Sequence, residues 1–408
     1  MHTIDELKNL NGKKVLVRVD FNVPLKGSEI RDDNRVVQAL PTIKKLLSEG
    51  ASLVLMSHLG KIKWGKADDA EIAKAKEKNN MKYVLPCLQG YLPGVKVSFS
   101  EATSGLALKE AISALGPGEV LLVQNTRYEK GEEKNDPKLA ADWASNVDAF
   151  VMDAFGSAHR AHASTYGVPE ILKSKGLPVA LGYLMEKEVK NLGACVRGDE
   201  HPYIAILAGF KVSDKIKVIN SLLKKCDKIL IGGAMCFTFY KALGMNTGNS
   251  PVEDDQLEYA RECYASGKIV LPIDTKVADD FDNPKDIRTV DTDIGIANEC
   301  IPDGYNGMDI GQKTVERFSD IIRTAKLIFW NGPVGVFERV EFQDGTLGIC
   351  KAIAHNENCF SVIGGGDSAA AAKEFGYVDR FSHVSTGGGA SLEMIENDGH
   401  LPGIDVIG

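Results

Sequence analysis

The sequence predicts an α/β protein that is built from parallel sheets and divided into two domains. Short apolar runs alternate along the chain with segments of helical periodicity, which is the rhythm of βαβ units. The chain has 408 residues, whereas a single hydrophobic core stops growing at about 250–300 residues. A charged helical stretch at 184–200, "LMEKEVKNLGACVRGDE", separates two groups of apolar runs and predicts a linker helix.

Each expected strand is a mostly apolar run that ends in a polar or glycine-rich turn. These runs lie at 14–21, 51–58, 119–125, 147–155, 202–209, 227–233, 268–274, 325–332 and 359–366. The segments 34–50 and 213–226 carry apolar residues at helical spacing and end at a glycine or a polar residue. Ligands of open α/β sheets bind at the carboxyl ends of the strands, so the residues that follow these runs are the candidates for function.

Composition excludes several classes of protein. The formal net charge of -8 argues against a general nucleic-acid binder, which normally carries a basic excess. The eight cysteines form no CxxC pair, which favours reduced thiols over disulfides or a zinc site. The chain contains no run of about 18 apolar residues and begins without a signal-like apolar segment. We therefore expect a cytoplasmic protein, with no membrane or nucleic-acid partner.

The first half of the chain places cations after several of its strands. Arg18, Asp20 and Asn22 share one side of "VLVRVDFN", because side chains alternate along a strand. The other polar residues of this kind are Arg35, His58, Lys61, Arg127, His159, Arg160 and His162. A single Arg is usually a surface residue, and "HRAH" lacks the partners of a zinc site. Together, in an acidic chain, these residues predict a pocket for a small polyanion such as a phosphorylated acid.

The second half places glycines after its strands, in "LAGFKVSDK", "LIGGAM", "WNGPVGVFE", "IGGGDS" and "STGGGASLE". One such glycine usually marks only a tight turn. Several of them in one domain, with Asp367 at the start of a helix, favour a nucleotide-phosphate site in which Asp367 can hold Mg²⁺. No GxGxxG follows the first strand of either half, so a dinucleotide site has little support.

The segment 60–67, "GKIKWGKA", also fits the spacing GxxxxGK of a P-loop, with Lys66 as the phosphate-binding lysine. The strand that ends at Asp153 could then pass for its acidic metal-binding strand. However, Ala67 stands where a P-loop needs Ser or Thr to bind the metal. This alternative predicts that Lys66 matters for activity.

The order of the motifs and their residues resemble those of the phosphoglycerate kinase family over nearly the whole chain. They include "VLVRVDFNVP", "SHLGK", "DAFGSAHRAHAST", "KVSDKI", "IPDGYNGMDIGQKT", "WNGPVGVFE", "IGGGDSAAAA" and "FSHVSTGGGASLE". The resemblance implies two Rossmann-like, doubly wound parallel-sheet domains that face each other across a cleft. It also implies Mg²⁺-dependent transfer of a phosphoryl group from 1,3-bisphosphoglycerate to ADP, which gives 3-phosphoglycerate and ATP, in a monomer whose domains close about a hinge.

The resemblance assigns a role to each motif residue. Phosphoglycerate would be held by Asp20, Phe21, Asn22, Arg35, His58, Leu59, Gly60, Lys61, Arg127 and Arg160, with Arg18, His159 and His162 completing the basic patch. Nucleotide would be held by Gly209, Lys211, Lys215, Gly232, Gly233, Asn331, Pro333, Glu338, Gly365, Gly366, Asp367 and Ser368, with Asp367 as the metal ligand. The catalytic residues would be Arg35, Lys211, Gly387 and Gly388.

The resemblance also implies the domain boundaries. The N-terminal phosphoglycerate domain would span 1–183, the linker helix 184–200 and the nucleotide domain 201–390. A tail at 391–408 would pack back on the N-terminal domain.

The sequence departs from the family pattern at several positions. Lys61 stands for the usual Arg, Gln124 for the usual Glu, Phe210 for a small residue and Ala234 for a third glycine. Segment 62–82 is unlike the common form, and its charge pattern predicts a solvated helix. A non-catalytic protein that keeps the anion sites is a further alternative, which predicts binding without turnover.

Overall fold

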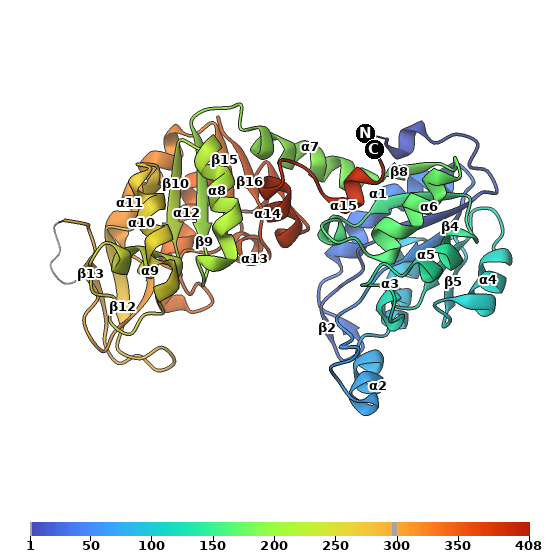
Figure 1. The fold of residues 1–408 in the computed structure, drawn as a ribbon, viewed down its shortest axis with the longest axis horizontal. Helices are drawn as coiled ribbons and strands as arrows, with labels where there is room; N and C mark the ends of the chain where they lie inside the picture. Colours follow the sequence, from blue (N-terminus) through green and yellow to red (C-terminus); the bar gives the residue numbers. More distant parts are fainter. Residues whose placement is uncertain (1, 296–299) are drawn as a thin grey trace. The chain divides into compact units, whose positions relative to one another are not determined.

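The computed structural model of the chain describes residues 2–295 and 300–408. The chain divides into two compact units, one formed by residues 2–190 together with His400–Gly408 and the other by the described residues of Asn191–Gly399. Both units are α/β with a parallel sheet (Figure 1), which confirms the predicted fold class. The junction between the units falls inside helix α7 (Tyr183–Arg197), close to the expected linker helix at 184–200.

Unit 1 is organised around a six-stranded parallel sheet whose strand order is β5-β6-β4-β1-β7-β8. Its strands are β1 (Lys14–Val19), β4 (Ser52–Met56), β5 (Val97–Ser100), β6 (Val120–Val123), β7 (Ala149–Asp153) and β8 (Val179–Leu181), beside a hairpin of β2 (Leu25–Lys26) and β3 (Glu29–Ile30). Its other helices are α1 (Asn34–Ser48), α2 (Asp69–Lys78), α3 (Leu85–Tyr91), α4 (Gly105–Ser113), α5 (Pro137–Ala144), α6 (Val168–Ser174) and α15 (Pro402–Asp405). The central strands are buried on both faces, as expected of a parallel sheet between helices.

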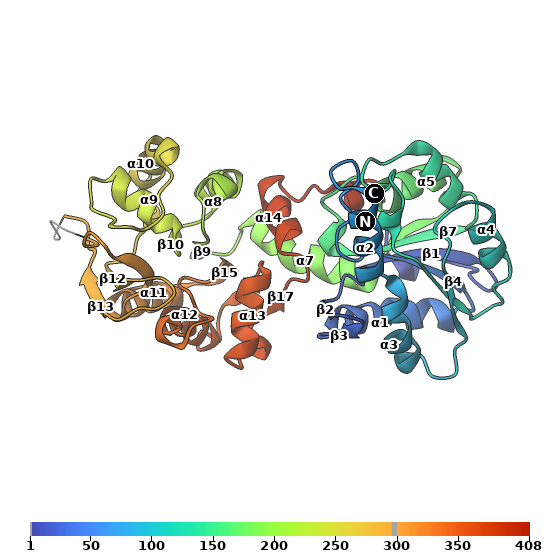
Figure 2. The same cartoon turned by 90° about the horizontal axis from the view of Figure 1, so that it is seen from below.

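Unit 2 contains a second six-stranded parallel sheet, of strand order β11-β10-β9-β15-β16-β17. Its strands are β9 (Tyr203–Ala208), β10 (Lys228–Gly232), β11 (Ile269–Val270), β15 (Leu327–Asn331), β16 (Phe360–Ile363) and β17 (His383–Val384). Its helices are α8 (Ile216–Lys225), α9 (Met235–Ala242), α10 (Leu257–Ala265), α11 (Gln312–Thr324), α12 (Asp344–Ala354), α13 (Gly366–Glu374) and α14 (Gly388–Glu396). Figure 2 shows α8, α9 and α10 on one face of this sheet and α11 and α12 on the other.

The strand order of unit 2 is that of a Rossmann sheet, since the chain runs outward from β9 to β11 and then returns to β15 on the other side. The gap between β9 and β15 is therefore the switch point, where the loops after adjacent strands diverge and leave room for a ligand. The sequence pattern did not predict the separate antiparallel sheet of unit 2, which consists of β12 (Asp274–Ala278), β13 (Ile287–Asp291) and β14 (Asn306–Ile310). Its strands are short and partly polar, so they lack a long apolar run.

Two predicted segments differ from the structure. The tail that belongs to unit 1 is His400–Gly408, whereas residues 391–399 lie in unit 2, where the Ser221 hydroxyl donates to the Ile395 carbonyl at 2.9 Å. The predicted helix at 62–82 is confined to α2: residues 64–66 form a turn before it, and Ile62 and Met81, on either side of it, are buried. As predicted, no residue of α2 is buried.

Both ends of the described chain lie in unit 1. The His2 N–H donates to the Gly408 carbonyl at 3.3 Å, and the Gly403 N–H donates to the Ala158 carbonyl at 2.8 Å. The segment 400–408 is therefore part of unit 1, on the side of that unit where β7 and β8 lie. All eight cysteines are free thiols, as the sequence predicts.

Asp153, the last residue of β7, is buried at the beginning of α7. Its Oδ1 accepts the N–H groups of Leu184 at 3.1 Å and Met185 at 3.4 Å, while its Oδ2 has no partner among the described residues. Burial raises the pKa of this carboxyl to about 7, against the opposing hydrogen bonds from Thr42, Met185 and Leu184. Asp153 therefore caps the helix and is not exposed to bind a metal, which argues against the P-loop alternative.

We predict that Asp153 makes the stability of unit 1 depend on pH. Its pKa is higher in the folded state than in the unfolded state, so the folded protein holds the extra proton and loses stability as the pH rises from about 4 to about 7. Asp153→Asn keeps the accepting oxygen and should remove this part of the dependence. Urea midpoints of both proteins, measured from pH 5 to pH 8, check it, and parallel curves would contradict it.

Candidate active site

The predicted cations of unit 1 come together at one edge of its sheet. The strands β6, β4, β1 and β7 are neighbours and run parallel, so the loops that follow them emerge side by side. Arg127 follows β6, His58 follows β4, and Arg18 and Asp20 lie at the end of β1. His159, Arg160 and His162 follow β7, and Arg35 lies in the first turn of α1. We call this group the basic half-site.

Arg18 is the buried centre of the basic half-site. Its side chain has no exposed surface, and its Nη2 lies 3.1 Å from Nδ1 of His58. Its Nε donates to the Ser164 hydroxyl at 2.7 Å, and its Nη1 donates to the Val19 carbonyl at 2.6 Å. Arg18, which the sequence analysis placed in the basic patch, is therefore buried beneath that patch and contacts His58.

Glu132 supplies the buried negative charge behind this arginine. Its carboxylate accepts the N–H and the hydroxyl of Ser164, each at 2.8 Å, and it has no exposed surface. Burial lowers the pKa of Arg18, and the charges of Glu132 and Asp20 oppose that shift. Sequence reasoning missed Glu132 and Ser164, because a carboxylate and a hydroxyl give no signal until the fold brings them to Arg18.

Among the other cations of the half-site, Arg127 is buried and Arg35 is half-buried. Arg35 forms an ion pair with Asp20, and the Arg127 guanidinium donates to the Gly60 carbonyl at 2.7 Å. The Gly60 N–H donates to Oδ1 of Asn22 at 2.8 Å. Arg160 and Lys61 are exposed, so their charges face solvent.

The side chains of Phe21 and Leu59 lie in the hydrophobic core, so only their backbone can serve the predicted binding role. The Phe21 N–H is already engaged by the Ser57 hydroxyl at 2.8 Å.

The histidines of the half-site are neutral near pH 7. Burial and then the charge of Arg18 hold the pKa of His58 well below its usual value. Burial and then Arg160 lower the pKa of His159 to about 4. Burial also lowers the pKa of His162, although Glu132 opposes the shift. The positive charge available to an anion therefore comes from the arginines and Lys61.

The predicted residues of unit 2 come together at the switch point between β9 and β15. Lys215 follows β9, and its ammonium donates to Oδ1 of Asn331, the last residue of β15. The Asn331 amide donates in turn to the Gly364 carbonyl at 2.8 Å, after β16. Burial lowers the pKa of Lys215 to about 8, and the carboxylates of Asp214 and Asp367 oppose that shift. We call this group the glycine half-site.

Two helix N-termini meet at the glycine half-site. Gly365 precedes α13 and Gly387 precedes α14, and a Cβ added at Gly388 would lie 3.2 Å from Cα of Gly365. The Ser368 hydroxyl is buried and accepts the Gly332 N–H at 2.7 Å, so it braces the loop after β15. Asp367 and Lys211 are exposed. The N-termini of two helices make this edge suited to phosphate, because backbone N–H groups of a first helical turn have no partner within the helix.

Glycine is required at Gly233, a predicted site residue, and at Gly332 of the motif "WNGPVGVFE". Gly233 has φ +64°, and its Cβ would lie 2.9 Å from the Gly209 nitrogen, while Gly332 has φ +99° and its Cβ would lie 2.0 Å from the Ala208 carbonyl oxygen. Ala234 has helical backbone angles at the start of α9, so the alanine that departs from the family pattern is tolerated there. Pro333 is half-buried in the loop after β15, and Glu338 is exposed. Gly232 packs on Val334.

Phe210 is 66% exposed, so it is not a core residue. It lies between Gly209 and Lys211 in the loop after β9, where the sequence analysis placed it.

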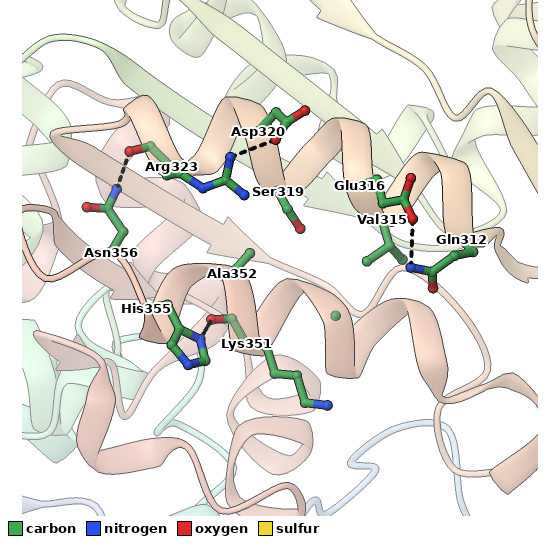
Figure 3. Close-up of a pocket in the computed structure, with 11 residues that line it drawn as sticks. Gln312, Val315, Glu316, Ser319, Asp320, Arg323, Lys351, Ala352, His355 and Asn356 are labelled. Carbon is green, nitrogen blue, oxygen red and sulfur yellow. Dashed lines mark hydrogen bonds and ion pairs between the residues drawn. The ribbon is translucent and has the colours of Figure 1, made fainter.

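A groove of about 450 Å³ lies elsewhere in unit 2, between α11 and α12 (Figure 3). Polar side chains line it, including Glu316 and Asp320 of α11, Lys351 of α12 and His355 directly after α12. Its lining includes none of the predicted site residues. The described residues hold no helix long and apolar enough to cross a membrane, and no group of three His, Cys, Asp or Glu side chains suited to a metal.

Comparison with known proteins shows the family of this chain. The family model described as phosphoglycerate kinase matches residues 4–398. The chain belongs to the phosphoglycerate kinase family. It is 51% identical over 405 residues to the phosphoglycerate kinase of Fusobacterium nucleatum, covering 98% of this chain and 97% of that one. It is 50% identical over 405 residues to that of Staphylococcus haemolyticus, with the same coverage.

Solved structures agree as well. The phosphoglycerate kinase of Coxiella burnetii superposes with a TM-score of 0.84 at 33% identity, covering 99% of this chain and 98% of that one. The enzyme of Pyrococcus horikoshii gives a TM-score of 0.83 at 32% identity, covering 100% and 98%. As a member of this family the chain is a kinase that transfers phosphate to a carboxyl group, with a role in glycolysis.

Proposed function

We propose that this chain catalyses the reversible transfer of a phosphoryl group from 1,3-bisphosphoglycerate to ADP, which gives 3-phosphoglycerate and ATP. The observation that carries this proposal is that one chain of this family holds a cationic group of residues in unit 1 and a glycine-rich group in unit 2. Each half-site lies at the carboxyl edge of its own sheet, which is where such sheets bind ligands.

The basic half-site binds phosphoglycerate in this proposal. Arg35, Arg127 and Arg160 offer guanidinium groups that match the geometry of phosphate and carboxylate oxygens. His58, held by Arg18, offers a neutral imidazole, and Asp20 orients Arg35 through their ion pair. His159 and His162 line the patch, and Asn22 positions the loop of Gly60 and Lys61.

The glycine half-site binds the nucleotide. Lys215, Asn331 and the first turns of α13 and α14 surround the place where phosphate oxygens would lie. Gly209, Gly232, Gly233 and Pro333 shape the adjoining loops, and exposed Glu338 is available to the ribose hydroxyls. Backbone N–H groups from Gly387 to Gly389 and the exposed Lys211 would stabilise the phosphoryl group in transfer.

This reaction needs no general base, because the carboxylate that accepts or releases the phosphoryl group is already ionised at neutral pH. Catalysis then consists of holding the reacting groups in line and neutralising the charge of the phosphoryl oxygens. Fixed cations and backbone N–H groups serve both purposes, and these are the groups that the two half-sites provide.

The residues fit a magnesium ion that is shared with the nucleotide. Asp367 offers one exposed carboxylate in the first turn of α13. Mg²⁺ is commonly held by one or two carboxylates together with substrate phosphates and water, so a single Asp is a sufficient protein ligand. When bound, the ion would neutralise phosphate charge.

We infer that the enzyme is a cytoplasmic monomer that takes ATP or ADP as its co-substrate.

We predict that Lys211→Ala lowers kcat about 10²-fold or more. In this proposal the Lys211 ammonium neutralises charge on the phosphoryl group during transfer, so it acts mainly on the transition state. The KM values for 3-phosphoglycerate and MgATP should change little. Lys66→Ala is the control and should retain the parent rate. An assay that couples ADP formation to a dye measures both variants. A larger loss of rate in Lys66→Ala than in Lys211→Ala would restore the P-loop alternative. Binding of substrates without turnover in the parent would support a non-catalytic protein.

Lys215 should give nucleotide binding a pH dependence. Its pKa of about 8 means that the ammonium loses its proton as the pH rises through 8, so the KM for MgATP should rise between pH 7 and pH 9. Lys215→Arg keeps its charge over this range and should flatten the profile, even where its absolute KM is higher. Equal slopes in the parent and the variant would show that Lys215 is not the titrating group.

Phe210→Ala should lower the KM for MgATP by about threefold, the scale of a relieved contact worth less than 1 kcal/mol. The exposed ring occupies a position where the family pattern has a small residue, so we expect it to crowd the nucleotide. The KM for 3-phosphoglycerate serves as the internal control and should not move. Unchanged constants for both substrates would mean that the ring points away from the ligand.

A further inference from the structure

Residues 62–81 lie between β4 and α3, and none of them belongs to either half-site. We call this segment the brace. It contains α2, none of whose residues is buried, so this helix contributes little to the hydrophobic core of unit 1. Several polar contacts of the brace nevertheless reach one short stretch of the chain, residues 124–128 after β6, which carries Arg127.

Trp64 makes the central contact of the brace. Its indole N–H donates to the backbone carbonyl of Arg127 at 2.9 Å, and the side chain is half-buried. Two ammonium groups lie over its ring, Nζ of Lys76 at 4.9 Å and Nζ of Lys130 at 5.1 Å from the centroid. Cation–π contacts of this kind fix the ring over the turn.

Tyr128 ties α2 to the other side of Arg127. Its hydroxyl donates to the Lys76 carbonyl, and Nζ of Lys76 lies 5.2 Å from the centroid of its ring. The brace is thus attached at the Arg127 carbonyl and at the residue that follows Arg127. These two attachments fix the backbone from which the arginine side chain projects.

The C-terminal end of the brace is attached to the residues that precede Arg127. The Asn125 amide donates to the Asn79 carbonyl at 2.9 Å, and the Met81 N–H donates to Oε1 of Gln124 at 2.8 Å. The Gln124 amide donates to Oδ1 of Asn80 at 2.8 Å. The stretch 124–128 is therefore held by the brace along its length.

Gln124 is matched to this arrangement, although the family usually has Glu at this position. A glutamate has no N–H group to donate to Asn80, and it would add a negative charge beside Glu101, whose Oε2 lies 3.4 Å from Nε2 of Gln124. Asn80 is not free to rotate its amide in compensation, because its Oδ1 also accepts the Lys82 N–H at 3.0 Å. Gln124 differs from the family's usual residue, and the brace differs from the family's common form. The contacts between them show that these two differences fit each other.

Arg127 itself is only 8% exposed, so its position depends on its surroundings. Its guanidinium donates to the Gly60 carbonyl at 2.7 Å and lies 3.4 Å from Glu133, while its Nε has no partner among the described residues. An arginine side chain has many rotamers, and holding its backbone in place lowers the entropy lost when it grips a ligand.

We propose that the brace positions Arg127 for phosphoglycerate, with Trp64 and Gln124 as its positioning residues. This inference rests on the proposed function, since it assigns Arg127 to the substrate. The brace contacts the turn that carries this arginine, and both belong to unit 1, whereas the glycine half-site belongs to unit 2. Its loss should therefore weaken the use of phosphoglycerate and leave the use of nucleotide unchanged.

Three variants test the brace by steady-state kinetics. Trp64→Phe keeps an aromatic ring under the two lysines and removes the N–H, so the KM for 3-phosphoglycerate should rise about threefold to tenfold, the effect of one lost hydrogen bond. Trp64→Ala should raise it further. Gln124→Glu, which introduces the family's usual residue, should also raise it. The KM for MgATP should stay at the parent value in all three.

Trp143→Phe is the matched control, because the Trp143 indole N–H donates to the Thr103 carbonyl at 2.7 Å, at a place in unit 1 that the brace does not touch. It should lower the thermal midpoint without raising the KM for 3-phosphoglycerate. A double-mutant cycle that combines Trp64→Phe with Arg127→Ala should be non-additive, since the tryptophan acts through the arginine.

The possible failures are distinct. A parent chain with no turnover of 3-phosphoglycerate and MgATP would refute the proposed function itself. An active parent whose Trp64 variants keep its KM for 3-phosphoglycerate would refute the brace alone. Equal rises in both KM values, or a rise matched by Trp143→Phe, would show a general loss of structure and would also overturn the inference.

Discussion

Parallel pairing of β1 with β4 on one side and β7 on the other determines where the cations of unit 1 lie. In this register Arg18 pairs with Met56 of β4 and with Met152 of β7, so the three strands end at the same edge. A shift of one residue would reverse the faces of β1 and turn Arg18 away from His58. The fully buried apolar side chains of these strands fix the register, and the position of the basic half-site follows from the packing of the core.

Charge is the second constraint on this half-site. A buried arginine is tolerated only where a negative charge and hydrogen-bond acceptors surround it, and Glu132 and Ser164 meet that condition for Arg18. Burial, and after it the charges of neighbouring arginines, holds the pKa values of His58 and His159 below the usual value of histidine. The half-site is therefore organised before any ligand arrives, with its buried charges compensated and its exposed ones, such as Arg160, facing solvent.

Much of the fold could be predicted from the sequence, because the central strands are long apolar runs that end in distinctive residues. The strands β5, β8 and β17 of the parallel sheets escaped prediction because they are short, and the antiparallel sheet of β12, β13 and β14 escaped it because its strands are partly polar. The site followed the same rule. Residues at strand ends were found, whereas Glu132 and Trp64 were not, because their importance comes from contacts that link distant parts of the chain, such as Trp64 with Arg127.

The return of residues 400–408 to unit 1 has a consequence for biosynthesis. A ribosome must make the whole of unit 2 before it supplies the segment that packs against Ala158 and bonds to His2. Domains generally fold as units while the chain emerges, with the N-terminal one first. Here the first unit to emerge is the last to be completed, so during translation its β7–β8 side stays uncovered until unit 2 has been made.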